Sequence, residues 1–197
     1  MRRTIGVAVA VALSMGMMSS ASAAQPKLSS ELLSVGQMPV GWSVDNSSSS
    51  GGGVGCFNSR YMEPKGVTQT AKTVVYFQSS AANGLPTLNE KLATYSNTSS
   101  AYKKIVTTLT SCKSFSGKYQ GHKMVGTVGQ MSFGTYGTSS EAFAVDFTYA
   151  GTAAYEDSLI VRKGNVVMSI NEGNLSPVNV KQFQGFVVKA LAKLRTQ

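Results

Sequence analysis

The second half of the chain alternates apolar and polar residues over long stretches, and this alternation constrains the fold more than any other feature. In a β-strand every second side chain lies on the same face. One run of apolar residues at alternate positions is Phe143, Val145, Phe147 and Tyr149. A weaker strand is predicted over residues 123–131, and strands at 158–162 and 165–170 flank the turn Lys163-Gly164. Because short turns join antiparallel neighbours, the sequence predicts an antiparallel sheet.

Other elements are predicted before and after this strand-rich region. A β-branched and aromatic segment at 71–78 predicts an earlier strand. Apolar residues recur at helical spacing over 85–95 and 102–112, and a long C-terminal helix is predicted to begin at Ser176-Pro177. The order of these elements predicts an α+β fold. In it, an antiparallel β-sheet flanked by helices forms a two-layer sandwich, with room for a cleft between the sheet and the helices.

The first 23 residues have the three parts of a secretory signal peptide. Two arginines precede an apolar run over 5–18, and a small-residue cleavage site, Ser-Ala-Ser-Ala, follows at 20–23. The chain therefore divides into a signal peptide, residues 1–23, and a single secreted domain, residues 24–197. A membrane-spanning helix needs about 20 apolar residues, so no integral membrane segment is expected after cleavage, and the product is expected outside the cell or in the cell envelope.

The chain is basic, with 18 lysines and arginines against nine acidic residues. The positive charge is dispersed, with local concentrations only at Lys103-Lys104 and at the C-terminal Lys189, Lys193 and Arg195. Dispersed charge on an exported chain argues against nucleic acid as a partner. Anionic envelope polymers or lipid headgroups are better matched to it. The oligomeric state is left open by the sequence.

The chain contains two cysteines, Cys56 and Cys112. Two thiols in an oxidising compartment usually pair, so one disulfide is expected. Closing a loop of this length would stabilise the fold by about 4 kcal/mol in the chain-entropy model. The alternative, a catalytic thiol, would depend on His122 as its base. The two cysteines and the single histidine leave no zinc-ligand spacing, so no metal site is predicted.

The sequence lacks a complete catalytic set. No serine lies in a G-x-S-x-G turn. The single histidine, His122, follows a glycine at the start of a predicted strand, where an exposed or edge-strand histidine is a better interpretation than a general base. If His122 has a role, a weak, pH-sensitive ligand contact is the modest one. A glycine-rich run at 51–55 lacks the lysine and the hydroxyl group of a phosphate-binding loop. The run is therefore interpreted as a linker, and no cofactor is predicted.

Acidic residues supply the remaining candidates. Glu156-Asp157 is the only adjacent acidic pair, and its members should point to opposite faces of a strand, in a solvated position. Asp146 and Thr148 share the strand face opposite the apolar run described above. If that face is open they line a groove, and otherwise they face solvent. The ligand-binding candidates are therefore His122, Asp146 and Thr148.

Several short motifs occur in a characteristic order: Met38-Pro39-Val40-Gly41-Trp42, Cys56, the Tyr76-Phe77 strand, the helix end from Leu109 through Cys112 to Phe115, and the Lys163-Gly164 hairpin. In this order they resemble the PknH-like extracellular sensor domains of actinobacterial cell-envelope proteins. The resemblance covers most of the mature chain, and it implies an antiparallel sheet flanked by helices around a ligand-binding cleft. Some family members carry two disulfides, whereas Cys56 and Cys112 can form only one.

These observations lead to one main hypothesis and two alternatives. The main hypothesis is a secreted, non-enzymatic, sensor-like domain that binds a small molecule or a cell-envelope component in a cleft between sheet and helices. One alternative is a secreted hydrolase that uses His122 and a nearby carboxylate. The other is a host- or envelope-interaction protein without a ligand, which predicts a structure without a cleft.

Overall fold

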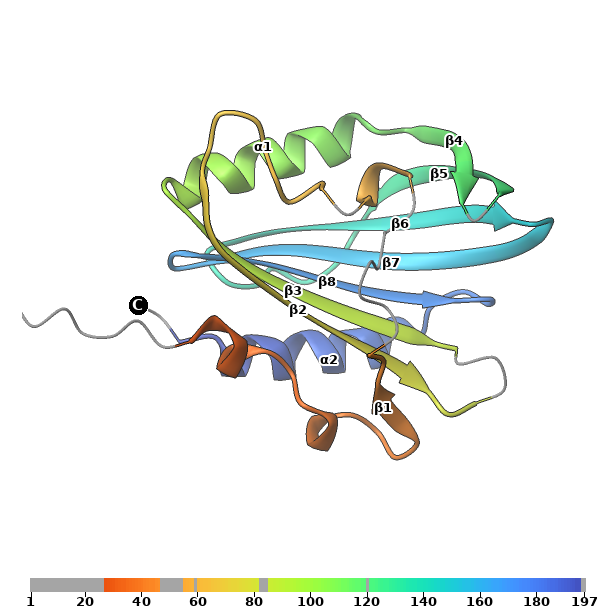
Figure 1. Ribbon diagram of the computed structural model, residues 1–197, viewed down its shortest axis with the longest axis horizontal. Helices are drawn as coiled ribbons and strands as arrows, with labels where there is room; N and C mark the ends of the chain where they lie inside the picture. The colour runs from red at the N-terminus through yellow and green to blue at the C-terminus, as the bar shows by residue number, and fades with distance from the viewer. Residues whose placement is uncertain (1–26, 47–54, 59, 82–84, 120, 196–197) are drawn as a thin grey trace, which may run out of the picture.

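A computed structural model describes residues 27–46, 55–58, 60–81, 85–119 and 121–195 of the chain (Figure 1). The predicted signal peptide and most of the glycine-rich run lie outside the described residues. Within the described part, no helix is both long enough and apolar enough to cross a membrane.

The described residues form one antiparallel sheet of eight strands, in the order β1-β2-β3-β8-β7-β6-β5-β4. The strands are β1 (Trp42–Val44), β2 (Gln69–Ser79), β3 (Thr87–Tyr95), β4 (Ser114–Tyr119), β5 (His122–Met131), β6 (Ser139–Tyr149), β7 (Thr152–Lys163) and β8 (Val166–Asn174). Helices in the described residues are α1 (Thr98–Ser111), α2 (Val180–Lys193) and the short 3-10 helices η1 (Leu28–Glu31), η2 (Val35–Gln37) and η3 (Gly55–Phe57). The N-terminal strands therefore join the last strand, β8, near the middle of the sheet.

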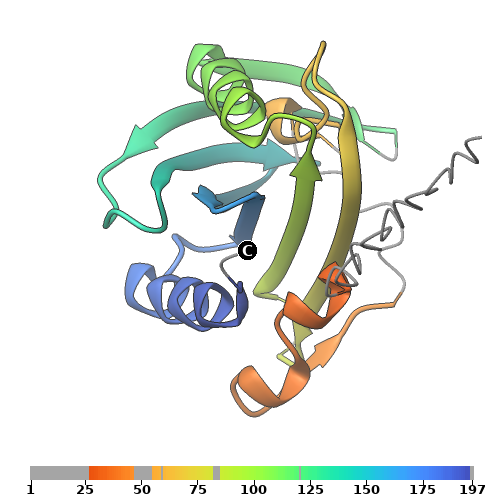
Figure 2. The same ribbon diagram turned by 90° about the vertical axis from the view of Figure 1, so that its left-hand side faces the viewer.

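The two α-helices lie on opposite faces of the sheet (Figures 1 and 2). Along β8, Met168 and Ile170 pack in the apolar cluster that includes α2, whereas Val167 packs in the cluster that includes α1. We call these two surfaces of the sheet the α2 face and the α1 face. Every residue of β8 from Val166 to Glu172 is buried, because both faces of this strand are covered.

The predicted two-layer sandwich is wrong. The antiparallel sheet is present, but it is the middle layer, with one helix on each side. The physical reason lies in strands such as β7, where Leu159 and Val161 pack on the α2 face and Ile160 between them packs on the α1 face. A strand that is apolar on both faces must bury both, and one layer of helices covers only one.

The predicted helix over 85–95 is also wrong, because most of this segment forms β3. Leu88 and Leu92 are four residues apart, a spacing that fits one face of a helix and equally one face of a strand. In the structure both leucines lie on the α2 face, while Ala93 and Tyr95 lie on the α1 face. Pairing with β2 and β8 on either side decides in favour of the strand.

The other predicted strands correspond to β2, β5, β6, β7 and β8, and the predicted helix at 102–112 corresponds to α1. The last helix begins at Val180, a few residues after the predicted start at Ser176. Asn179 is its N-cap, and the Asn179 side chain accepts a hydrogen bond from the backbone amide of Gln182 at 3.1 Å. This bond satisfies one of the backbone donors that lack a partner within the helix.

The C-terminal end of α2 is fixed to the sheet by a lysine of the β7–β8 turn. Lys163 donates hydrogen bonds to the carbonyl oxygens of Leu191 and Leu194, at 2.9 and 2.7 Å. These carbonyl groups lie at the C-terminal end of the helix, where they have no amide partner within the helix. A cation at this end also interacts favourably with the helix dipole. Buried Phe183 and Val187 supply the apolar contact between α2 and the sheet.

Candidate functional site

A broad, open groove of about 1300 Å³ lies between α1 and the segment that precedes β2. One wall is formed by residues of 55–58 and 60–65, and the groove also reaches the start of β4. The residues of α1 that line it are Lys103, Lys104, Thr107, Thr108 and Ser111. These positions recur with the helical period and form the exposed side of α1, whereas Ala101, Ile105 and Leu109 form its buried side.

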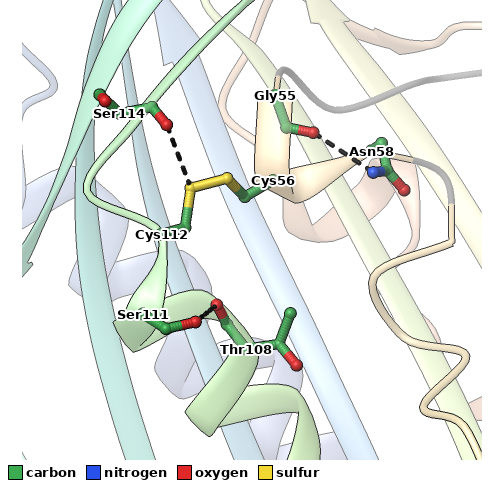
Figure 3. The surroundings of a disulfide bond; sticks show 7 residues. All are labelled: Gly55, Cys56, Asn58, Thr108, Ser111, Cys112 and Ser114. Atoms are coloured by element: carbon green, nitrogen blue, oxygen red, sulfur yellow. Dashed lines mark hydrogen bonds between the residues drawn. A yellow bond between two sulfur atoms is a disulfide. The ribbon is translucent and has the colours of Figure 1, made fainter.

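The disulfide expected from the sequence borders this groove (Figure 3). Cys56 and Cys112 are bonded, with their Cα atoms 6.4 Å apart. Cys112 is the C-cap of α1, and its backbone amide donates to the carbonyl oxygen of Leu109 at 3.1 Å. On the other side, Asn58 Nδ2 donates to the carbonyl oxygen of Gly55 at 3.3 Å. The disulfide therefore ties the segment that forms one wall to the helix that forms the other.

The groove is strongly basic. Its lining includes five cationic side chains from separate parts of the chain: Arg60, Lys65, Lys103, Lys104 and Lys113. The one acidic residue in the lining, Glu63, forms an ion pair with Lys72 at 2.9 Å. Since α1 itself contains no acidic residue, the lining carries an excess of positive charge.

Tyr61 connects the groove to the interior of the α1 face. It lines the groove, and its hydroxyl group forms a hydrogen bond with the hydroxyl group of Ser169. Ser169 donates to Oδ1 of Asn171 at 2.7 Å. Nδ2 of Asn171 donates to Ser158 Oγ at 2.6 Å and to Glu156 Oε1 at 3.0 Å. We call this buried chain of hydrogen bonds, which runs from Tyr61 to Glu156, the polar network.

Burial changes the ionisation of the polar network. Desolvation raises the pKa of Glu156, although hydrogen bonds from Asn171 and Ser158 and the charge of Lys91 oppose the rise. Desolvation lowers the pKa of Lys91, against the attraction of Glu156. The Lys91 ammonium group lies 4.9 Å from the centroid of the Tyr61 ring, a cation–π contact. Burial also raises the pKa of Tyr61, so its hydroxyl group stays protonated.

The chemistry open to the polar network is limited by its burial. Ser158 and Ser169 have no exposed surface, so neither hydroxyl group reaches a molecule in the groove. Their hydrogen bonds instead hold Asn171 and, through Ser169, the hydroxyl group of Tyr61. The network therefore positions one aromatic residue of the groove lining.

The α2 face holds a second group of buried polar side chains, and these are carboxyl groups with incomplete pairing. Glu90 accepts a hydrogen bond from the Leu33 amide at 2.6 Å, while its other oxygen has no partner among the described residues. Glu172 and Asp157 lie opposite each other on β8 and β7. Burial raises the pKa of Glu90 and of Glu172 to about 7. Burial, together with the charge of Asp146, raises the pKa of Asp157 to about 6.

The structure does not bring the three predicted ligand-binding residues together. Asp146 and Thr148 line a second concavity of about 460 Å³ beside β5, β6 and β7. His122 is not part of that lining. Its side chain is exposed, and its ring packs edge to face against Tyr149, with 5.5 Å between the ring centroids. A role of these residues in ligand binding stays a prediction.

The acidic pair Glu156-Asp157 is buried, and the expectation of a solvated position is wrong. The two residues are only 9% and 8% exposed, because β7 is a central strand of the sheet.

Tyr61 and Asn171 were not among the residues predicted from the sequence. A usable signal for Asn171 is the presence of Ser169 two positions earlier, which places two polar side chains on one face of an otherwise mostly apolar segment, residues 166–171. Within the described residues, no group of three or more His, Cys, Asp or Glu side chains is arranged to hold a metal ion.

Comparison with known proteins shows a similarity in fold. No family model and no curated protein matches the sequence. Among solved structures, the fold is similar to that of the extracellular domain of PknH from Mycobacterium tuberculosis, with a TM-score of 0.51 and 12% sequence identity. The similarity covers 64% of this chain and 64% of that domain. The chain therefore has a PknH-like extracellular-domain fold, in agreement with the resemblance of its short motifs.

Proposed function

We propose that the protein is an extracellular, non-enzymatic, sensor-like domain that binds a small molecule or a cell-envelope component in the groove between α1 and residues 55–58 and 60–65. The observation that carries the proposal is the groove, which is broad, bordered by a disulfide and lined by cationic and hydroxyl side chains. Ligand sites are concave and combine apolar walls with a few convergent polar groups. Here Tyr61 and Phe115 supply apolar surface beside the lysines.

Two further observations support the extracellular location and the binding role. The disulfide between Cys56 and Cys112 is stable in an oxidising compartment, in keeping with the signal peptide predicted at residues 1–23. The fold is similar to that of an extracellular domain. The disulfide and the polar network also hold two parts of the lining in place, which lowers the entropy lost when a ligand binds.

The concavity at Asp146 and Thr148 is a second candidate site. Its lining includes Val125, Phe147 and Tyr155 beside the Asp146 carboxylate. An apolar pocket with one carboxylate suits an apolar molecule that carries a cationic or hydrogen-bonding group. The two sites therefore differ in the sign of the charge that they prefer.

Nuclear magnetic resonance with ¹⁵N-labelled protein distinguishes these sites. We would titrate the purified protein with defined envelope fragments, namely soluble muropeptides and oligosaccharides, and follow backbone amide shifts. We expect shifts in α1 and in residues 60–65. Thr108→Trp, which fills the groove, should abolish them, whereas Thr148→Trp, which fills the second concavity, should not. Shifts centred on β5 to β7 and abolished by Thr148→Trp would contradict the proposal, as would the absence of shifts with both classes of fragment and with an anionic polymer.

A further inference from the structure

We infer that the ligand of the α1 groove is a linear polyanion that lies along the exposed side of α1. This inference rests on the proposed function and names the chemical class of the ligand. Its first support is the local excess of charge. Five cations and one acid line the groove, a ratio of five to one, whereas the whole chain has 18 basic and nine acidic residues. That one acid, Glu63, is paired with Lys72, which lies outside the lining.

The distribution of the cations favours a polymer over a single small anion. Arg60 and Lys65 lie on one wall, Lys103 and Lys104 lie on α1, and Lys113 lies beyond the helix end. A small anion would contact only some of these groups at once. The volume of about 1300 Å³ also exceeds the range of roughly 300–1000 Å³ that is typical of small-molecule pockets.

Lys104 holds the two sides of the groove in a fixed relation. Its ammonium group donates a hydrogen bond to the carbonyl oxygen of Lys65 at 2.8 Å, across the groove from α1 to the opposite wall. The hydrogen bond therefore holds the ammonium group against the opposite wall. A cation held in this way loses less conformational entropy when it meets an anionic group.

The helix end itself does not attract the anion. The C-terminal end of α1 carries partial negative charge, and the hydroxyl groups of Thr108 and Ser111 already donate to backbone carbonyl oxygens, at 2.9 and 2.8 Å. The attraction must come from the lysine and arginine side chains. Binding that depends on exposed cations releases counterions and weakens steeply as salt is added.

The surface around the groove favours a soluble polymer over a lipid membrane. Proteins that lie on membranes combine basic residues with apolar side chains that enter the bilayer. The large apolar side chains that are exposed in the described residues lie elsewhere: Val35, Val40, Val44, Val74, Val125, Leu175, Val180 and Val188. The groove therefore offers charge without the apolar side chains that insertion into lipid would require.

The test measures binding of inorganic polyphosphate to the purified protein by titration calorimetry, at several salt concentrations. Lys103→Gln/Lys113→Gln removes two exposed charges for which the structure records no hydrogen bond, and we expect at least tenfold weaker binding. We also expect the slope of log affinity against log salt concentration to become shallower by about 1.4–1.8. The matched control is Lys27→Gln/Lys181→Gln, which removes the same charge outside the lining and should change affinity less than twofold.

Polygalacturonate serves as a second probe, because it carries carboxylate in place of phosphate. Binding of either polymer that depends on Lys103 and Lys113 supports the inference, and the stronger of the two identifies the anionic group. Equal loss in the control variant would overturn it, as would tighter binding to vesicles of anionic lipid than to either polymer. If neither polymer binds at low salt while muropeptides or oligosaccharides still shift the groove amides, the inference is wrong and the proposed function stands.

Discussion

The two faces of the sheet differ in the hydrogen bonding of their buried polar side chains, and two neighbouring residues of β8 show the difference. Asn171, on the α1 face, exchanges hydrogen bonds with Ser169, Ser158 and Glu156. Glu172, on the α2 face, has one carboxyl oxygen without a partner among the described residues, and burial raises its pKa to about 7. Both residues are almost fully buried. The supply of partners, and not burial itself, decides whether such a group stabilises the fold.

The face that holds the polar network is also the face that carries the groove. The polar network ends at Tyr61, which lines the groove, and the disulfide fixes the segment that holds Tyr61 to the end of α1. A binding site works best when its lining is held by a second layer of packed and hydrogen-bonded residues. The α1 face therefore has the organisation of a site, whereas the α2 face has the organisation of a core.

The largest effect is expected from removal of the disulfide, which sharpens this contrast. Cys56→Ala/Cys112→Ala should lower the free energy of unfolding by about 4 kcal/mol, because it releases a loop closed over a sequence separation of 56 residues. Denaturant unfolding measures this loss. Hydrogen exchange at subdenaturing conditions should show α1 and residues 55–58 and 60–65 opening before α2. A loss below about 1 kcal/mol in the free energy of unfolding, or hydrogen exchange that speeds up equally in both helices, would contradict the role given to the disulfide in fixing one wall of the groove to α1.

A smaller loss is expected from removal of the centre of the polar network. Asn171→Leu keeps a similar volume but removes the hydrogen bonds that Ser169, Ser158 and Glu156 make to Asn171, so we expect a loss of about 2–3 kcal/mol in the free energy of unfolding. Asn89→Leu is the matched control, since Asn89 lies opposite Asn171 in the sheet and its Oδ1 has no partner to lose. The control should lose less than about 1 kcal/mol. Equal losses in the two variants would mean that the hydrogen bonds of the polar network add no stability of their own.

On the α2 face, removing a buried polar group is expected to raise the free energy of unfolding instead of lowering it. Glu172→Gln is expected to raise the free energy of unfolding at pH 8 by about 1 kcal/mol, because the amide removes a desolvated charge. In the wild type, the folded-state pKa of Glu90 and of Glu172 lies near 7, above the ordinary value of 4.5. The folded state then binds more protons than the unfolded state, so stability falls as pH rises from about 4.5 to 7 and levels off above that range.

Thermal denaturation of the wild type and of Glu172→Gln between pH 5 and pH 8 measures both expectations. The variant should show a flatter profile and should lose its advantage at pH 5, where the wild-type carboxyl group is protonated. A wild-type stability that rises across this range, or a variant that is less stable than the wild type at pH 8, would remove the difference between the two faces.

The smallest effect is expected at His122, which belongs to neither face's core. His122→Ala removes an exposed ring that packs on Tyr149 and should lower the free energy of unfolding by about 0.5 kcal/mol. Groove binding should be unchanged, because His122 is outside the lining. Loss of a hydrolytic activity in this variant would support the alternative of a secreted hydrolase.

Strands were more predictable than the arrangement of the layers. Alternation in the segment 143–149 identifies a strand face directly, and the turn at Lys163-Gly164 identifies a hairpin. The spacing of Leu88 and Leu92 does not distinguish a helix from a strand, and β3 was missed for that reason. Amphipathic helices reveal that they pack on a sheet but not on which face, so the two-layer arrangement was predicted where the structure has a helix on each side.

The groove was less predictable than the disulfide that borders it. The sequence shows Lys103-Lys104 as a local concentration of charge, but only the fold brings Arg60 and Lys65 to the same groove, about 40 residues earlier in the chain. Tyr61 gave no signal, because its partner Ser169 is 108 residues away. Residues that meet across such separations are joined by tertiary packing, which periodicity and local composition do not describe.

The central pairing of β3 with β8 has a consequence for the order in which the molecule is made. β3 ends at Tyr95, and its partner β8 is the last of the described strands to be synthesised. Until β8 emerges from the ribosome, the first three strands lack a neighbour on one side and the polar network lacks Ser169 and Asn171. Pairings between distant segments also form slowly. We therefore expect the domain to stay unfolded until β8 has been synthesised, so that its first three strands spend the whole synthesis of β4 to β7 without their central partner.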